Sequence, residues 1–405
     1  MASLHPFRAL RPAPGTAPSV SSVPYDVVSA DEARQLAAET PLSFLRVTRS
    51  EIDLPPSTDP YSPQVYARAR KNFESLKQQA PLVVEDTPSL YFYRLRMGEH
   101  EQTGVAGCFS VDEYESDVIK KHERTRRDKE DDRTRHILEL RAQTGVVFLT
   151  YKTARGVESV VTRVTVGEPL YDFTAADGVH HTLWRIPDAD ARLVVAEFAA
   201  IPALYIADGH HRAASAARAR AELRGKPGAD QSNSFIAVAF PDDQVQILPY
   251  HRTVKDLAGR SPEQFLDELR QVAPVGEGHA RPRRKGEVSM YLGGRWYVID
   301  LSRTTPEDDT HASSLDVALL QRNVLERILA IGDIRSDKRI DFVGGARGTK
   351  ALEDAVDSGK AAVAFSMHPV DIEDLMAISD AGGIMPPKST WFEPKLRDGL
   401  LIHTI

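Results

Sequence analysis

Five consecutive residues between a strand-like and a helix-like stretch carry groups that could bind an anion. They are Asp208, Gly209, His210, His211 and Arg212. An apolar run at 203–206 precedes them, and good helix formers follow at 213–224. The positive end of a helix dipole disfavours cations, so two imidazoles and a guanidinium at a helix start need an explanation. Because backbone N–H groups at a helix N-terminus bind anions, we expect the turn at 209–212 to bind phosphate.

A second stretch, residues 119–136, is almost wholly charged. After Ile119 the next apolar residue is Ile137. Opposite charges four residues apart, such as Glu123 with Arg127, suit a solvated helix. Without an apolar face, however, such a helix has nothing to bury. The segment is therefore either an exposed arm or a segment ordered by a charged ligand, and the pattern does not separate the two.

Two histidine pairs, His180-His181 and His210-His211, raise the question of zinc. Adjacent side chains diverge by about 100° on a helix or 180° on a strand, so neither pair can chelate an ion by itself. The dipeptide Asp177-Gly178 predicts a hairpin turn, which explains the position of the first pair without a metal. The sequence therefore favours no metal site held by the protein alone.

The composition of the 405-residue chain is that of an ordinary globular protein, with 41% hydrophobic and 27% charged residues. A net charge of −7 argues against a nucleic-acid binder. The N-terminal residues lack the apolar stretch of a secretory signal, and no run is long enough to span a bilayer. The single cysteine, Cys108, lies in an apolar run and is expected in a buried strand. These features predict a cytoplasmic protein without a membrane partner.

Strand-like and helix-like segments mix along the chain without a regular alternation, which predicts an α+β fold. We expect three regions. They are an N-terminal α+β region at 1–110, a catalytic core at 111–260 and a C-terminal α+β region at 261–405.

Several stretches along the chain together resemble one family. They are residues 5–12, 24–29, 121–125, 128–133, 143–145, 207–212, 337–345 and 385–395. On these residues the chain resembles the DUF1015 family, a domain of unknown function in the ParB/sulfiredoxin-like superfamily that is linked to free L-serine kinases. The resemblance implies a ParB/sulfiredoxin-like nucleotide-binding core with additional N- and C-terminal α+β regions.

The resemblance also implies a reaction, the nucleotide-dependent phosphorylation of free L-serine or a similar hydroxylated metabolite. In the serine kinases a glutamate in a His-Glu pair is the catalytic base, and the matching pair here is His122-Glu123. The five residues Asp208–Arg212, called the box below, would bind the phosphates of ATP or ADP through residues 209–212, with Mg²⁺ as cofactor. Asp208 and His210 are implied as further catalytic residues, and Asp208 either caps the helix or helps to hold Mg²⁺.

The serine kinases bind serine through a histidine and a threonine, which His251 and Thr253 match. A different class of function stays open, a non-catalytic ParB-like nucleotide-binding switch or scaffold. Such a protein would bind nucleoside triphosphate without forming a phosphorylated product.

Overall fold

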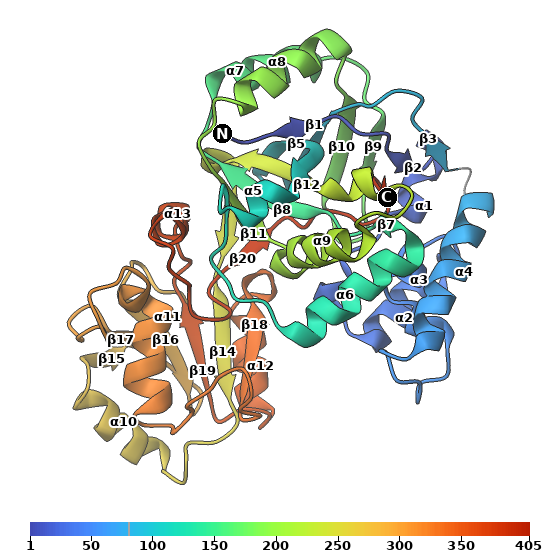
Figure 1. Ribbon diagram of the computed structural model, residues 1–405. Helices are drawn as coiled ribbons and strands as arrows, with labels where there is room; N and C mark the ends of the chain where they lie inside the picture. The colour runs from blue at the N-terminus through green and yellow to red at the C-terminus, as the bar shows by residue number, and fades with distance from the viewer. Residues whose placement is uncertain (80–81) are drawn as a thin grey trace. The chain divides into compact units, whose positions relative to one another are not determined.

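The computed structural model describes residues 1–79 and 82–405, which form two compact units. The first unit comprises Met1–Val245 and Pro394–Ile405, and the second comprises Gln246–Glu393. Both units mix helices and strands, so the predicted α+β class is confirmed (Figure 1).

A nine-stranded mixed sheet forms the centre of the first unit. Its main order is β6-β11-β8-β12-β5-β4-β10-β9, and β1 pairs with β5. The neighbours β6 and β11 run parallel, as do β8 and β12. The strands of this unit are β1 (Leu4–His5), β2 (Leu10–Arg11), β3 (Val83–Val84), β4 (Tyr91–Met97), β5 (His100–Ser110), β6 (Ile119–Lys120), β7 (Ala142–Gln143), β8 (Val147–Tyr151), β9 (Tyr171–Thr174), β10 (His180–Arg185), β11 (Leu204–Asp208), β12 (Ser234–Pro241) and β21 (His403–Thr404).

Helices complete the core of the first unit. They are α1 (Ala17–Val20), α2 (Ala30–Ala38), α3 (Leu45–Thr48), α4 (Pro63–Gln79), α5 (Val111–Glu115), α6 (Arg127–Leu140), α7 (Arg155–Val164), α8 (Asp188–Phe198) and α9 (His210–Leu223). Alternate residues of β8, such as Val147 and Leu149, join one buried apolar cluster with Val194 of α8 and Ala213 of α9. This alternation is what a strand with one face in the core requires.

The boundaries differ from the three predicted regions. The predicted boundary at 110 falls inside the first unit, because β5 ends at Ser110 and pairs with β12 from Val105 to Ser110. Residues 1–110 thus contribute central strands to the same sheet as residues 111–245. The second unit begins at Gln246, before the predicted boundary at 260. Cys108 is buried in β5, as expected.

The charged segment at 119–136 starts with β6 and a loop, and from Arg127 it forms most of the helix α6, which packs between α4 and α9 (Figure 1). It is anchored through polar side chains. The hydroxyl of Tyr66 donates to buried Asp132 at 2.8 Å, and Arg133 pairs with the same carboxylate at 2.7 Å. The guanidinium of Arg133 also lies over the ring of Tyr25. The exposed-arm interpretation is therefore wrong, because buried polar groups with partners replace the missing apolar face.

The second unit is built on a six-stranded antiparallel sheet of order β15-β17-β16-β19-β14-β18. Its strands are β13 (Gln246–Leu248), β14 (Tyr250–Val254), β15 (Val275–Glu277), β16 (Glu287–Leu292), β17 (Arg295–Asp300), β18 (Ile340–Gly344), β19 (Val363–Met367) and β20 (Trp391–Glu393). Its helices are α10 (Pro262–Arg270), α11 (Asp316–Leu320), a π-helix at Gln321–Glu326, α12 (Lys350–Asp357) and α13 (Ile372–Asp380).

Candidate functional site

The box lies where β11 ends and α9 begins. Gly209 is the N-cap of α9 and has a φ of 99°, in the left-handed region that favours glycine. A Cβ at this position would lie 3.2 Å from Cζ of Arg212. Because Gly209 has no side chain, it cannot cap the first turn as Ser29 caps α2, and the first N–H groups of α9 need another acceptor. The site thus has the backbone features of an anion-binding turn.

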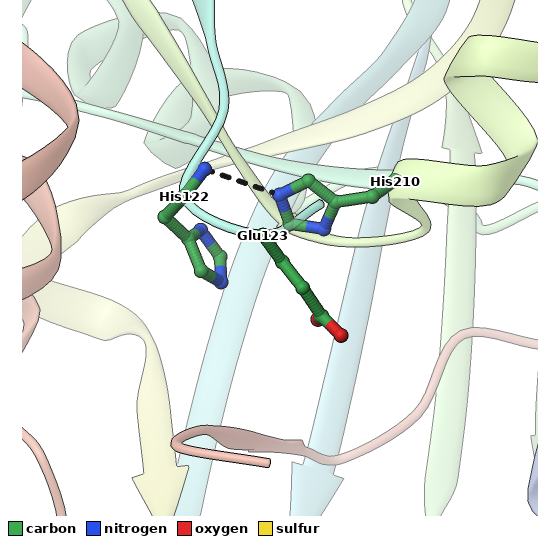
Figure 2. Close-up of side chains that lie close together, drawn as sticks. All are labelled: His122, Glu123 and His210. Atoms are coloured by element: carbon green, nitrogen blue, oxygen red, sulfur yellow. Dashed lines mark hydrogen bonds between the residues drawn. The ribbon is translucent and has the colours of Figure 1, made fainter. Parts of the chain in front are cut away.

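The sheet register brings Glu123 to this turn. Strand β6 runs parallel to β11, with Ile119 opposite Leu204 and Lys120 opposite Tyr205. Parallel neighbours end at the same edge of a sheet, so the loop after β6 and the turn after β11 meet. Ligand atoms of His122, Glu123 and His210 all lie within 4.8 Å of one another (Figure 2).

Both histidines of the box hold the loop that carries Glu123. The backbone N–H of His122 donates to Nε2 of His210 at 3.4 Å (Figure 2). The backbone N–H of Arg126 donates to Nε2 of His211 at 2.9 Å. A ring nitrogen that accepts a hydrogen bond carries no proton, and these two bonds therefore favour neutral imidazoles.

Burial lowers the pKa of His210 well below its usual value, and the neighbouring His122 lowers it further. Burial likewise lowers the pKa of His211 and brings that of His122 to about 4. Burial thus favours the neutral form of all three rings, which limits the positive charge that the histidines add to the start of α9. The two hydrogen bonds show His210 and His211 holding the loop of Glu123, and phosphate binding by the two residues stays a prediction.

Arg212 points into the protein. Its side chain is 6% exposed and donates to the carbonyl oxygen of Val146, and it pairs with Asp26 at 3.3 Å and with Asp208 at 3.4 Å. Gly145 makes room for it, because a Cβ there would lie 3.0 Å from the Cδ of Arg212. Two carboxylates already offset the charge of this guanidinium. From its buried position, Arg212 therefore connects the start of β8, the box and the N-terminal segment.

Three residues far from the box in sequence complete its surroundings, namely Asp26, Lys395 and Asp398. Nζ of Lys395 lies 3.1 Å from Oδ2 of Asp208. Although burial alone raises it, Lys395 and Arg212 hold the pKa of Asp208 well below its usual range. Sequence reasoning assigned no role to these residues. The available signal was that Asp26 and Lys395 belong to stretches that carry the family resemblance.

His251 and Thr253, predicted to bind serine, lie in the second unit on β14. Both side chains are buried, and β14 is paired on both sides by β18 and β19. Nδ1 of His251 accepts a hydrogen bond from the backbone N–H of Met367 at 3.2 Å. The hydrogen bond gives His251 a role within the sheet, and substrate binding by the two residues stays a prediction.

The site combines a partly exposed carboxylate, neutral imidazoles and an uncapped helix start. A carboxylate so placed can accept a proton, the helix start can receive an anion, and the His122, Glu123 and His210 side chains are of the types that hold a metal. These features define an α+β protein with a candidate acid–base site at the end of a parallel strand pair.

The sequence profile of the family described as "Protein of unknown function (DUF1015)" matches residues 4–318, and the chain belongs to this family. A search of curated protein sequences found no match. In the described ranges, 1–79 and 82–405, no helix is both long and apolar enough to cross a membrane.

Solved structures similar to the chain include SbnI with a C-terminal truncation from Staphylococcus aureus, at 12% identity and a TM-score of 0.40 over 74% of this chain and 87% of that one. A free serine kinase in complex with AMP is 13% identical, with a TM-score of 0.37 over 74% of this chain and 91% of that one. A conserved hypothetical protein from Pyrococcus furiosus is 15% identical, with a TM-score of 0.35 over 74% and 94% of the two chains. Likenesses this distant carry no functional conclusion, and the ParB/sulfiredoxin-like assignment stays a prediction.

Proposed function

We propose that the chain is a nucleotide-dependent kinase of small hydroxylated metabolites, with free L-serine as the first acceptor to test. The observation that supports this most directly is the position of Glu123. Its carboxylate lies within 4.8 Å of a ring nitrogen of His210, the first residue of α9. A proton acceptor therefore stands beside a helix start that is suited to phosphate.

In the proposed reaction, the terminal phosphates of ATP or ADP bind at the backbone N–H groups of residues 209–212. The acceptor hydroxyl oxygen attacks the terminal phosphorus while Glu123 takes the hydroxyl proton. The bond from phosphorus to the bridging oxygen breaks, and the nucleotide leaves with one phosphate fewer. Mg²⁺ bound to the nucleotide would neutralise part of the phosphate charge.

The surrounding residues would act by holding this geometry. His210 and His211 fix the loop of Glu123 through the bonds to the His122 and Arg126 backbone. Arg212 and Lys395 hold Asp208, which ends β11 directly before the turn. Positioning of this kind is a large part of catalysis in phosphoryl transfer, because the protein does little covalent chemistry itself.

The test is a product assay. The protein is incubated with Mg²⁺, separately with ATP, ADP or CTP, and with a panel of hydroxylated metabolites that includes L-serine, and the products are identified by mass spectrometry. An O-phosphorylated acceptor formed in step with nucleotide loss would support the kinase. Tight nucleotide binding without any phosphorylated product would favour the switch or scaffold function instead.

A further inference from the structure

Three side chains that are good metal ligands meet beside the start of α9 (Figure 2). One ligand atom each from His122, Glu123 and His210 lies within 4.8 Å of the others, and we call this set the HEH cluster. A divalent ion bound at about 2.0–2.2 Å keeps its ligand atoms roughly 3–4 Å apart. The HEH cluster therefore reaches a coordinating geometry through small side-chain adjustments.

The imidazole of His122 points most clearly to a ligand. The residue is 2% exposed, and within the described ranges its Nδ1 has no hydrogen-bond partner. A buried polar atom without a partner is unfavourable, because it has lost its hydrogen bonds to water without replacement. A bound ion would give Nδ1 of His122 the partner that the described residues do not supply.

The other two members complete a recognisable donor set. The neutral ring of His210 does not repel a cation, and its one unprotonated nitrogen would exchange the 3.4 Å bond from the His122 N–H for the ion. Glu123 supplies a negative charge. Two imidazoles and one carboxylate suit transition-metal ions such as Zn²⁺ and Mn²⁺ better than Mg²⁺, which prefers oxygen ligands and water. Three protein ligands leave one coordination position for water or substrate, as in catalytic sites.

We propose that the HEH cluster binds one divalent transition-metal ion, of the Zn²⁺ or Mn²⁺ type, with a coordination position left for water or substrate. This ion is distinct from the Mg²⁺ that accompanies a nucleotide, and the proposal does not rest on the kinase function. Glu123 is also the proposed base, and a carboxylate bound to an ion is a weaker base. Metal binding is therefore measured without nucleotide, and turnover is measured in a separate experiment.

The experiment uses full-length protein that has been stripped with EDTA and then dialysed against Zn²⁺, Mn²⁺ or Co²⁺ without nucleotide. Metal content is measured by mass spectrometry, and Co²⁺ binding is followed by visible absorption. We expect one ion per chain in the wild type. Glu123→Gln and His210→Gln should each weaken binding at least tenfold, as changes at metal sites do. His180→Gln, which changes a histidine paired with Asp172 on the same sheet, should bind as the wild type does.

Thermal unfolding separates loss of a ligand from loss of the fold. In EDTA, Glu123→Gln should melt close to the wild type, and added Zn²⁺ should raise the melting temperature of the wild type only, because an ion stabilises the state that binds it. The proposal is overturned if the wild type takes up no stoichiometric ion. It is equally overturned if both cluster variants bind as tightly as His180→Gln, or if millimolar Mg²⁺ displaces Zn²⁺.

Discussion

The ammonium of Lys395 lies 3.1 Å from the carboxylate of Asp208, although 187 residues separate them in the sequence. The guanidinium of Arg212 approaches the same oxygen at 3.4 Å. The last residue of β11 is therefore held by two cations, one from the last segment of the chain and one from the first turn of α9. This arrangement fixes the residue that directly precedes the Gly209 turn.

Replacing Lys395 with methionine should lower the free energy of unfolding by about 1.5–3 kcal/mol at pH 7, the usual worth of a hydrogen bond to a charged group. The pKa of Asp208 is depressed in the folded protein, so its stabilisation is present above the unfolded value of 3.8 and is lost as the pH falls. The difference between variant and wild type should therefore shrink below about pH 4. Denaturant unfolding at pH 7 and pH 3 measures this, with exposed Lys71→Met as the control. An equal difference at both pH values would contradict the pairing.

Arg212→Met should cost about 3–5 kcal/mol, because it removes the buried guanidinium that pairs with Asp26 and Asp208. The matched control is Arg218→Met, which removes a partly exposed guanidinium paired with Glu130 and Asp131. The control should lose no more than about 1 kcal/mol. Urea unfolding of both variants decides the matter, and a similar small loss in each would contradict a buried structural role for Arg212.

Gly209→Ala tests the turn itself. A residue with a Cβ is less stable by about 1–2 kcal/mol in the left-handed region. Here the added carbon would also lie 3.2 Å from the Arg212 guanidinium. Gly178 offers a clean comparison, because its φ is 81° and a Cβ there would meet nothing within 4 Å. Gly209→Ala should therefore destabilise the protein more than Gly178→Ala. Equal losses would show that the close approach to Arg212 has no energetic effect.

Asp398→Asn should change how stability depends on pH. Burial raises the pKa of this carboxyl to about 7, with Arg212 partly opposing the rise, and Oδ2 has no hydrogen-bond partner in the described ranges. The folded state thus holds a proton that the unfolded state loses near 3.8, and stability falls as the pH rises from about 4 to 7. The variant should lack this fall and melt higher than the wild type at pH 8. Melting curves from pH 4 to 8 test it, with exposed Asp86→Asn as the control; parallel wild-type and variant curves would contradict it.

Local signals in the sequence predicted much of this structure. The apolar run before the box becomes β11, and the Ala-rich stretch after it becomes α9. The hairpin turn at Asp177-Gly178 joins β9 and β10. Each of these features depends on neighbouring residues only, which is why periodicity and turn residues suffice to predict them.

The pairing of distant segments could not be predicted in this way, because it does not depend on neighbouring residues. No local pattern indicates that β5 pairs with β12, or that β6 lies beside β11 and brings Glu123 to His210. Helix α6 was misread because its anchors, Tyr25, Tyr66 and Val47, belong to other segments. The guanidinium of Arg212 likewise looked unbalanced only while its partner Asp26 was unplaced.

The turnover of Glu123→Gln tests the central claim most directly. The substitution keeps the size of the side chain and removes its ability to accept the hydroxyl proton. Wild type and variant are compared in EDTA-treated protein with Mg²⁺, nucleotide and L-serine or the acceptor found in the product assay, with exposed Glu99→Gln as the control. We predict a loss of about 10²–10⁴-fold in kcat with nucleotide affinity unchanged. Normal turnover by Glu123→Gln would show that this carboxylate is not the base.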